Sequence, residues 1–467
     1  MKLATVVALS VAGSLSAANW PQFRGANGLG IAEGSPPPIH FGPGSNVLWK
    51  TQLPSGNSSP IIWGEKIFLT AFDKTKLETL CLHRRDGKVL WRAAAPAAKF
   101  EPTHKLGNPA TPTPTTDGER IYVSFGSFGL LAYDFAGKEV WRHPLPPPVV
   151  EFGTSASPIL WDNLVILLCD QDENSFLLAL DKRTGKQVWR VARGEFRRSF
   201  ATPFVWRHGN EEELIVPGSI WLTSYNKDGS ERWRYSGTSR VACSSPAGND
   251  SMLFSASWNV GGDESDRISM EPFEQFADEH DKNKDNRLAR DEIPVGPVKE
   301  RFSQMDLNKD DIVTPAEWQN MREMFAKAGN AVLAIRPGGK GDITRTHVAW
   351  KSTRSLPYVS SPLYYDGRLY TVKNGGLMSC YDAKTGKPFY QDERLDAGGD
   401  YYSSAVACGD RIFLASQKGT FVVLAAGDEL KILSRNDLGE QLMATPAIVD
   451  RKLYVRTPTA LFCFGER

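Results

Sequence analysis

Apolar residues in this chain fall into short runs separated by turn-forming residues, and the same arrangement returns many times. Its clearest copy has apolar runs at Ile159–Leu160, Leu164–Cys169 and Phe176–Leu180, then a polar turn at 181–186 and a fourth run that ends at Trp189. Short runs of this kind, rich in β-branched and aromatic residues and bounded by turn residues, are typical of antiparallel strands. The pattern therefore predicts units of four strands and an all-β fold.

Each unit begins with a small hydroxyl residue, which Pro follows in every copy but one. These openings are Ser59-Pro60, Thr113-Pro114, Ser157-Pro158, Thr202-Pro203, Ser245-Pro246, Ser361-Pro362, Ser404-Ala405 and Thr445-Pro446. They recur about every 43 residues, which is a period typical of propeller blades. The repeat predicts eight blades, and the interval between Pro246 and Pro362 is longer than the others by about 73 residues.

The two ends of the repeat complement each other. The last unit stops at Phe464 without a fourth strand, whereas Asn46–Lys50 has the sequence of a fourth strand with no unit before it. We expect the N-terminal strand, which carries Trp49, to complete the last blade and so remove an exposed sheet edge. The sequence thus predicts an eight-bladed β-propeller of four-stranded antiparallel blades.

The long interval, in blade five, contains helix-forming sequence and two acidic loops. Phe273, Phe276 and His280 lie at helical spacing, and residues 318–328 also favour a helix. Loop positions 1, 3, 5, 7 and 12 hold Asp281, Asn283, Asp285, Arg287 and Glu292 in the first loop and Asp306, Asn308, Asp310, Ile312 and Glu317 in the second. Such oxygens, with the backbone carbonyl at position 7, suit a hard cation. Both loops resemble the EF-hand calcium loop, and the resemblance implies Ca²⁺ binding by a small α-helical insertion.

The loops depart from the EF-hand pattern in places. Position 6 is Asn286 and Asp311 instead of Gly, and these residues tolerate the left-handed turn at some cost. Ala289 leaves position 9 of the first loop without a side-chain oxygen. Leu288 and Val313, at position 8, are expected to form a short β contact between the loops. We expect weaker calcium affinity than that of a cytosolic buffer; the alternative is a metal-free pair that folds as a small helical knob.

Two sequence motifs resemble those of a known family. Ala179-x-Asp181-x-x-Thr184-Gly185-Lys186-x-x-Trp189 and the opening Trp20-Pro21-Gln22-Phe23-Arg24-Gly25 resemble exported bacterial pyrroloquinoline-quinone-like (PQQ-like) eight-bladed propellers. The aromatic position of the repeat holds Trp49, Trp91, Trp141, Trp189, Trp233, Trp350 and Tyr390. The resemblance implies that each aromatic docks against the next blade. Enzymes and non-enzymes share this packing motif, so it implies the fold and not the chemistry.

The resemblance also defines what an enzyme of this family would need. A quinoprotein dehydrogenase would hold PQQ in the central channel, with a catalytic Asp, a calcium ion beside the quinone and often two adjacent cysteines. None of the six cysteines is adjacent to another, and no Cys-x-x-Cys-His motif occurs. Blade starts such as Asn57–Ser59 and Val359–Ser361 are small and polar. We therefore expect a non-catalytic scaffold without PQQ that recognises a protein or ligand; the alternative is a PQQ-dependent dehydrogenase of sugars or alcohols.

Several loop residues precede blade openings, where they reach the mouth of the expected channel. They are His104, Arg197, Arg198, Arg240, Tyr358, Tyr401 and Tyr402. They form either a recognition surface for an anionic or peptide ligand at the propeller face or a solvated loop rim.

The first residues resemble a cleavable signal peptide. Lys2 precedes an apolar run, Leu3–Leu15, and Ser16-Ala17-Ala18 has the small residues of a cleavage site. No Cys directly follows the cleavage region, the first being Cys81, so no lipoprotein anchor is expected. We predict a periplasmic or secreted monomer, in which the widely spaced cysteines are buried thiols and not a disulfide framework.

Charge and hydropathy narrow the classes of partner. With 55 basic and 54 acidic residues the net charge is +1. The molecule as a whole therefore has no strong positive electrostatic field that would attract nucleic acid. No later stretch reaches the roughly 20 apolar residues of a membrane span. The expected domains are a signal peptide (1–18), the first part of the propeller (19–263), the calcium-binding insertion (264–330) and the rest of the propeller (331–467).

Overall fold

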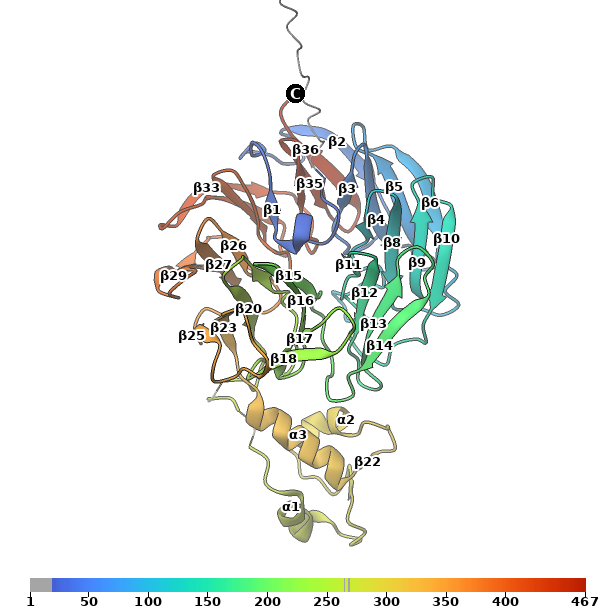
Figure 1. The fold of residues 1–467 in the computed structure, drawn as a ribbon, viewed down its shortest axis with the longest axis vertical. Coiled ribbons are helices and arrows are strands. Elements are labelled where there is room, and N and C mark those ends of the chain that lie inside the picture. Colours follow the sequence, from blue (N-terminus) through green and yellow to red (C-terminus); the bar gives the residue numbers. More distant parts are fainter. Residues whose placement is uncertain (1–18, 264, 268) are drawn as a thin grey trace, which may run out of the picture.

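The computed structural model describes residues 19–263, 265–267 and 269–467, and the expected signal peptide at 1–18 lies outside them. Eight antiparallel sheets stand around a central axis (Figure 1), so the prediction of an all-β, eight-bladed propeller is confirmed. No helix in this described part of the chain is long and apolar enough to cross a bilayer.

The first four blades follow the chain from its N-terminal side. Blade 1 consists of β3 (Ile61–Trp63), β4 (Lys66–Phe72), β5 (Leu77–His83) and β6 (Val89–Ala94). Blade 2 consists of β7 (Thr115–Thr116), β8 (Arg120–Phe125), β9 (Gly129–Asp134) and β10 (Glu139–Pro144). Blade 3 consists of β11 (Ile159–Trp161), β12 (Leu164–Cys169), β13 (Phe176–Asp181) and β14 (Gln187–Ala192). Blade 4 consists of β15 (Phe204–His208), β16 (Glu211–Pro217), β17 (Trp221–Tyr225) and β18 (Glu231–Ser236), with β24 (Gly341–Asp342) added in parallel to β18.

The other four blades complete the ring. Blade 5 consists of β19 (Ala247–Gly248), β20 (Leu253–Ser257), β23 (Ala331–Ile335) and β25 (Val348–Ser352). Blade 6 consists of β26 (Leu363–Tyr365), β27 (Arg368–Lys373), β28 (Leu377–Asp382) and β29 (Pro388–Arg394). Blade 7 consists of β30 (Val406–Cys408), β31 (Arg411–Ala415), β32 (Thr420–Ala425) and β33 (Lys431–Asp437), with β1 (Ile31–Ala32) added in parallel to β30. Blade 8 consists of β34 (Ala447–Val449), β35 (Lys452–Arg456), β36 (Ala460–Phe464) and β2 (Val47–Gln52).

Blade 8 confirms the expected closure of the ring. β2 pairs antiparallel with β36, and Trp49 lies opposite Cys463. The last blade is therefore built from both ends of the propeller, and its outer edge is formed by the N-terminal strand.

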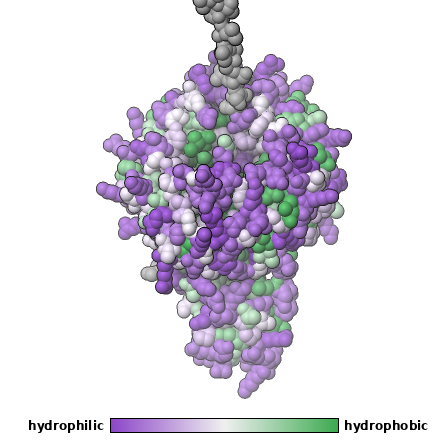
Figure 2. All heavy atoms as spheres, in the orientation of Figure 1, coloured by the Kyte–Doolittle hydropathy of each residue, from purple (hydrophilic) through white to green (hydrophobic). Residues whose placement is uncertain are grey.

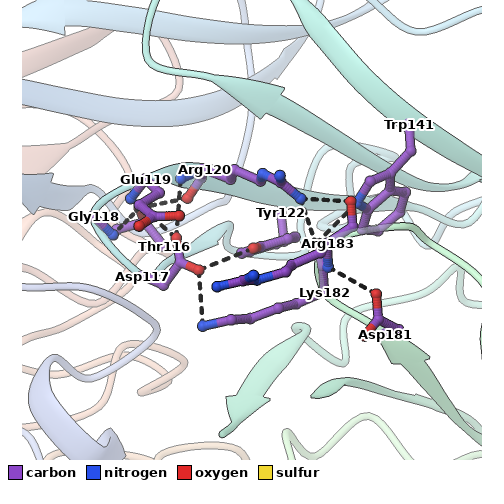
Figure 3. A network of polar contacts seen from close by, with 10 residues as sticks. All are labelled: Thr116, Asp117, Gly118, Glu119, Arg120, Tyr122, Trp141, Asp181, Lys182 and Arg183. Carbon is purple, nitrogen blue, oxygen red and sulfur yellow. Dashed lines mark hydrogen bonds and ion pairs between the residues drawn. The ribbon is translucent and has the colours of Figure 1, made fainter. Parts of the chain in front are cut away.

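Tryptophan side chains dock five of the blades on the next blade. Figure 3 shows the contact of blades 2 and 3, where Trp141 Nε1 donates to the carbonyl of Lys182 at 3.0 Å. A Cβ on Gly185, whose φ is +69°, would lie 2.6 Å from the Trp141 ring, so only glycine fits there. The same pairing joins Trp49 with Gly87, Trp91 with Gly137, Trp189 with Gly229 and Trp350 with Gly386. Trp233 differs, because its Nε1 donates to the buried carboxylate of Glu213.

The N-terminal segment 19–46 crosses the propeller before it reaches β2. Trp20 forms a bridge with Ile62 of blade 1, and η1 (Ala26–Gly28) follows. Arg24 is fully buried and donates to the carbonyls of Pro246 and Pro362, at 3.4 and 2.6 Å. The segment thus ties blade 1 to blades 5 and 6.

A helical insert, residues 258–330, lies between β20 and β23 of blade 5 and projects from the propeller, as the ribbon (Figure 1) and the space-filling view (Figure 2) show. It consists of α1 (Phe273–His280), β21 (Leu288–Ala289), η2 (Lys299–Arg301), α2 (Phe302–Met305), β22 (Ile312–Val313) and α3 (Pro315–Lys327). The expected helices are present as α1 and α3, and α2, between the two acidic loops, has only four residues in the described structure. Trp318 and Phe276 lie in its own apolar core, which also includes Ile220 of blade 4.

Candidate functional site

A closed ring of hydroxyl groups surrounds the propeller axis. The side-chain oxygen of each opening Ser or Thr accepts a hydrogen bond from the backbone N–H of the corresponding residue one blade earlier, at 2.9 to 3.1 Å. The eight members are Ser59, Thr113, Ser157, Thr202, Ser245, Ser361, Ser404 and Thr445. Each residue is both donor and acceptor, so the repeated hydroxyl at the unit opening joins neighbouring blades.

A cavity of about 440 Å³ lies at this ring. The loops before the blade openings form its wall, and Phe23 of the N-terminal segment also lines it. The side chains on the wall include all eight ring hydroxyl residues, the aromatic rings of Phe152 and Phe200, and Asn57. A cavity of this size with apolar walls and convergent polar groups is typical of a small-ligand site.

The charges on the cavity wall are of one sign. Arg198 and Arg240 line it together with His104, whereas no Asp or Glu is among the described residues that line it. Burial lowers the pKa of Arg240 to about 10, which leaves the guanidinium protonated at neutral pH. The cavity is therefore suited to an anionic or neutral polar ligand.

The loop residues that the sequence places near the channel do not all reach the cavity. His104, Arg198, Arg240, Tyr358 and Tyr402 line it. Arg197 instead lines a smaller cavity beside the insert. Tyr401 is buried in the core of blades 6 and 7, where its hydroxyl donates to the carbonyl of Ala397 at 2.8 Å. Tyr401 and Tyr402 lie in the loop before β30, and Tyr401 is buried in the core whereas Tyr402 faces the cavity.

The first acidic loop of the insert folds around its own carboxylates. Asp281 accepts hydrogen bonds from the backbone N–H groups of Lys284 (2.8 Å) and Asn286 (2.9 Å). Glu292, at the other end of the loop, accepts from Lys282 (2.9 Å) and Ala289 (2.8 Å). The acidic residues at positions 1 and 12 thus tie the two ends of the loop together.

The second loop folds in a similar way, although its position-1 Asp accepts from positions 5 and 6 instead of positions 4 and 6. Asp306 accepts from the backbone N–H groups of Asp310 (3.1 Å) and Asp311 (3.0 Å). Glu317 accepts from Leu307 (2.9 Å) and Thr314 (2.8 Å). Two loops with unlike flanking sequences therefore share one conformation.

The side chains at positions 3 and 5 make the same hydrogen bonds in both loops. Asn283 Oδ1 accepts from Asp285 N at 2.9 Å, and Asn308 Oδ1 accepts from Asp310 N at 3.2 Å. Asp285 and Asp310 accept from the N–H groups of Arg287 and Ile312, both at 2.9 Å. The carbonyls of Arg287 and Ile312 are the position-7 oxygens.

The backbone of both loops agrees with the expectations for positions 6 and 8. Asn286 and Asp311 have φ of 62° and 60°, which is the left-handed conformation that Gly more often supplies. Leu288 lies opposite Val313 in the short antiparallel pair of β21 and β22. Both predictions about the backbone are confirmed.

A separate acidic cluster occurs in blade 4, and sequence reasoning did not identify it. His208, Glu211 and Glu213 form the one trio in the described part of the chain whose His, Cys or carboxylate ligand atoms all lie within 4.8 Å of one another. Glu213 is fully buried; its carboxylate is 2.7 Å from His208 Nε2 and accepts from Ser224 Oγ at 2.6 Å. The Arg232 guanidinium lies 3.6 Å from the same carboxylate. In this cluster the carboxylate of Glu213 is already engaged by His208, Ser224 and Arg232.

All six cysteines are free thiols, and Cys81, Cys380, Cys408 and Cys463 are buried. The expectation of buried thiols without a disulfide framework is therefore confirmed for these four. Cys243 lines the large cavity, and burial raises the pKa of its thiol to about 12. This thiol is protonated at neutral pH and is a poor nucleophile.

A protein-family comparison matches residues 76–250 to the model for outer membrane protein assembly factor BamB. This segment is less than half of the chain. The search of curated proteins found no match.

Solved structures share the whole architecture. BamB from Moraxella catarrhalis is 12% identical with a TM-score of 0.55, over 90% of this chain and 98% of that protein. The quinohemoprotein alcohol dehydrogenase from Comamonas testosteroni is 11% identical with a TM-score of 0.55, over 98% and 82%. A europium-containing methanol dehydrogenase is 10% identical with a TM-score of 0.57, over 96% and 98%. The chain is thus similar to PQQ-like propeller repeat proteins, and these likenesses show the fold alone.

Proposed function

We propose that the chain is an exported, non-catalytic recognition propeller that holds a ligand in its central cavity and binds calcium through an EF-hand insert. The cavity of about 440 Å³ is the observation that carries the recognition role. Its lining combines ring hydroxyls, aromatic side chains and the cations Arg198 and Arg240. Aromatic faces supply contact area and the polar groups supply orientation, which is how small-ligand sites select their ligands.

The donor sets of the two insert loops fit calcium. Side-chain oxygens occupy positions 1, 3, 5 and 12 of both loops, and a backbone carbonyl occupies position 7. Oxygen-only donor sets of this kind suit calcium and not a soft metal. The paired loops, with Leu288 opposite Val313, support an assignment as one EF-hand unit. Calcium would supply the charge that offsets the repulsion among Asp281, Asp285 and Glu292.

Calorimetry on the full chain tests the calcium role. We expect two ions to bind at millimolar calcium, with the first loop weaker because Ala289 lacks an oxygen. Glu292→Gln and Glu317→Gln each remove a two-oxygen ligand and should each abolish one site. Asp291→Asn removes a charge at position 11 of the first loop, where the side chain is largely exposed and supplies no ligand, and should keep both sites. Absence of binding to the wild type, or unchanged stoichiometry in both glutamine variants, would refute the assignment.

Calcium should also act on the insert and not on the propeller. The loop carboxylates crowd one another without metal, whereas the closed blades depend on apolar packing and the hydroxyl ring. We expect calcium to raise one melting transition in calorimetry and leave the other unchanged. A shift of both transitions by the same amount would contradict an independent insert.

A cavity-filling variant tests recognition. Ser155 lines the cavity, so Ser155→Phe should displace whatever small molecule the exported protein retains. Ser251→Phe, at an exposed turn of blade 5, is the control. Mass spectrometry of the native wild type should find a retained ligand that the control keeps and Ser155→Phe loses. Equal spectra for all three proteins would remove the cavity as the site.

The alternative is a PQQ-dependent dehydrogenase of sugars or alcohols. A dehydrogenase of this type needs a carboxylate base and carboxylate ligands for calcium in the channel, and the described residues of the cavity wall include neither Asp nor Glu. The wall therefore does not fit that chemistry. Reconstitution with PQQ and calcium, followed by absorbance and dye-linked activity, should give no stoichiometric quinone and no turnover. Stoichiometric binding with turnover would establish the dehydrogenase instead.

A further inference from the structure

A second, smaller cavity lies where the insert packs against the propeller. It has a volume of about 40 Å³, and its wall combines residues of the propeller loops with residues of α2, α3 and the loop between them. We call it the seam cavity. Arg198, Arg240 and Gln304 line both the seam cavity and the large central cavity, so the two are adjacent.

Positive charge is in excess at the seam cavity. Among the described residues, its wall contains Arg197, Arg198, Arg240 and Lys309 and two carboxylates, Asp172 and Asp306. Both oxygens of Asp172 are taken by Arg198, at 2.5 and 2.9 Å. The carboxylate of Asp306 accepts two backbone N–H groups of its own loop. Neither carboxylate makes a hydrogen bond with Arg197.

Arg197 is the residue of this wall whose hydrogen bonding is incomplete. The residue is 7% exposed, and Nη1 donates to the carbonyl of Gln304 in the insert. Nη2 is buried and has no hydrogen-bond partner among the described residues. A buried guanidinium nitrogen without an acceptor costs free energy, so an acceptor at this point would be stabilised.

Arg240, on the same wall, also donates to neutral acceptors. Arg240 donates to Asn259 Oδ1 at 3.0 Å and to the carbonyl of Val260 at 2.7 Å, and both acceptors are neutral. Burial lowers the pKa of Arg197 to about 10, as it does for Arg240, and both remain charged at neutral pH. An anion in the seam cavity would meet two guanidinium groups that form no ion pair with a carboxylate in the described part of the chain.

We propose that the seam cavity binds one small oxyanion between Arg197 and Arg240. The volume admits a group of the size of sulfate, phosphate or a single carboxylate, since one water needs about 10 to 15 Å³ on this scale. Because the seam cavity is next to the central cavity, the oxyanion is either a free ion or the acidic group of a longer ligand held there. Planar guanidinium groups recognise both kinds of oxyanion by the same charge-assisted hydrogen bonds.

The site is also linked to the second insert loop, a step that rests on the proposed calcium binding. Asp306 is position 1 of that loop and a wall residue of the seam cavity. Calcium would neutralise its charge and raise the positive potential at Arg197. Calcium and the oxyanion should therefore strengthen each other's binding by the same factor.

Titration of sulfate into the full chain in low-chloride buffer tests the site. We expect one sulfate per chain, and binding at least about tenfold weaker in Arg197→Gln, because one charged hydrogen-bonding group is lost. Arg197→Lys should retain part of the affinity. Arg207→Gln removes an exposed arginine of blade 4 and should match the wild type. If the wild type binds no sulfate, a water satisfies Arg197 and the proposal is wrong.

A variant at an exposed residue tests the site without disturbing the fold at the buried Arg197. Lys309 is exposed on the loop, so Lys309→Gln should keep the melting temperature and weaken sulfate about threefold. Equal sulfate affinity in Lys309→Gln, Arg197→Gln and the wild type would overturn the assignment.

Acetate and N-acetylphenylalanine distinguish a free ion from the acidic group of a longer ligand, because only the acidic group of a longer ligand gains affinity from the attached aromatic ring.

The calcium link has its own readout. Glu317→Gln should lower sulfate affinity at saturating calcium to the calcium-free value, whereas Glu292→Gln should not. Sulfate binding without any calcium binding would refute the EF-hand proposal and keep the anion site. Calcium binding without sulfate binding would refute the anion site and keep the EF-hand proposal.

Discussion

The backbone N–H of Thr445 donates to the hydroxyl of Ser59 at 3.1 Å, across 386 positions of the chain. Ser59 in turn donates its own N–H to Thr113, at 3.0 Å. The bond between Thr445 and Ser59 is the one that joins the last blade to the first. Together with the pairing of β2 and β36 it closes the propeller, once at the axis and once at the rim.

Loss of the Ser59 hydroxyl should therefore weaken the closure. Ser59→Ala leaves the N–H of Thr445 buried without its acceptor, which costs about 1 to 3 kcal/mol. Ser59→Thr should be near wild type, since Thr occupies the equivalent position in three other blades. Guanidinium denaturation measures both free energies of unfolding. Equal midpoints for Ser59→Ala and the wild type would show that the ring bond adds nothing.

Features that repeat along the chain could be predicted, because each copy meets the same packing problem. The hydroxyl openings, the docked tryptophans and the fourth strand of the last blade all follow from a unit that must contact an identical neighbour. The conformations at Asn286 and Asp311 were predictable for the same reason, as a loop with fixed spacing has few backbone solutions. These are local or nearest-neighbour consequences of sequence.

Features that occur once could not be predicted. Nothing periodic places Arg24 against Pro246 and Pro362, or adds β24 to blade 4 in parallel. The contact of Arg197 with Gln304 joins segments 107 positions apart, and it depends on how the insert leans on blade 4. Tyr401 and Tyr402 are neighbouring residues of the same type in the loop before β30, yet the fold buries one and turns the other to the cavity.

The docking of Trp141 on Gly185 allows a matched comparison. Gly185→Ala would place a methyl group 2.6 Å from the indole ring, whereas Gly367→Ala, at a similar φ of +73°, meets nothing within 4 Å. We expect the second change to cost about 1 kcal/mol of backbone strain and the first about 2 kcal/mol more. Urea denaturation of the two variants gives the difference. Equal costs would mean that the ring moves aside freely.

Asp170 and Arg193 form a buried ion pair inside blade 3. Both side chains are inaccessible to solvent, and two hydrogen bonds of 2.8 and 2.9 Å join them. Asp170→Asn leaves the guanidinium charge uncompensated and should cost about 3 to 5 kcal/mol. The double variant Asp170→Asn with Arg193→Met removes that charge and should recover part of the loss in thermal denaturation. A double variant less stable than the single one would contradict the charge explanation.

Glu101 makes the stability of the cavity loops depend on pH. Its carboxylate is buried, accepts from Thr154 N and Oγ1 at 3.0 Å, and has its pKa raised to about 7, chiefly by burial. Between its ordinary pKa of 4.5 and about 7, the folded state binds the proton and the unfolded state does not. Stability therefore falls as the pH rises through this window, and the loss is complete above pH 7.

The protonation of Glu101 contributes about 3 kcal/mol to the free energy of unfolding, because each unit of pKa shift corresponds to about 1.4 kcal/mol. Glu101→Gln mimics the neutral acid and should lack this pH dependence. The free energy of unfolding of the variant should therefore rise relative to that of the wild type as the pH rises from 5 to 8. Free energies of unfolding at several pH values measure the difference between the two proteins, in which the other titrating groups cancel. A difference that stays constant with pH would show that Glu101 ionises at its ordinary pKa. The carboxylate would then be solvated in the folded protein, and the loop around Thr154 would be open.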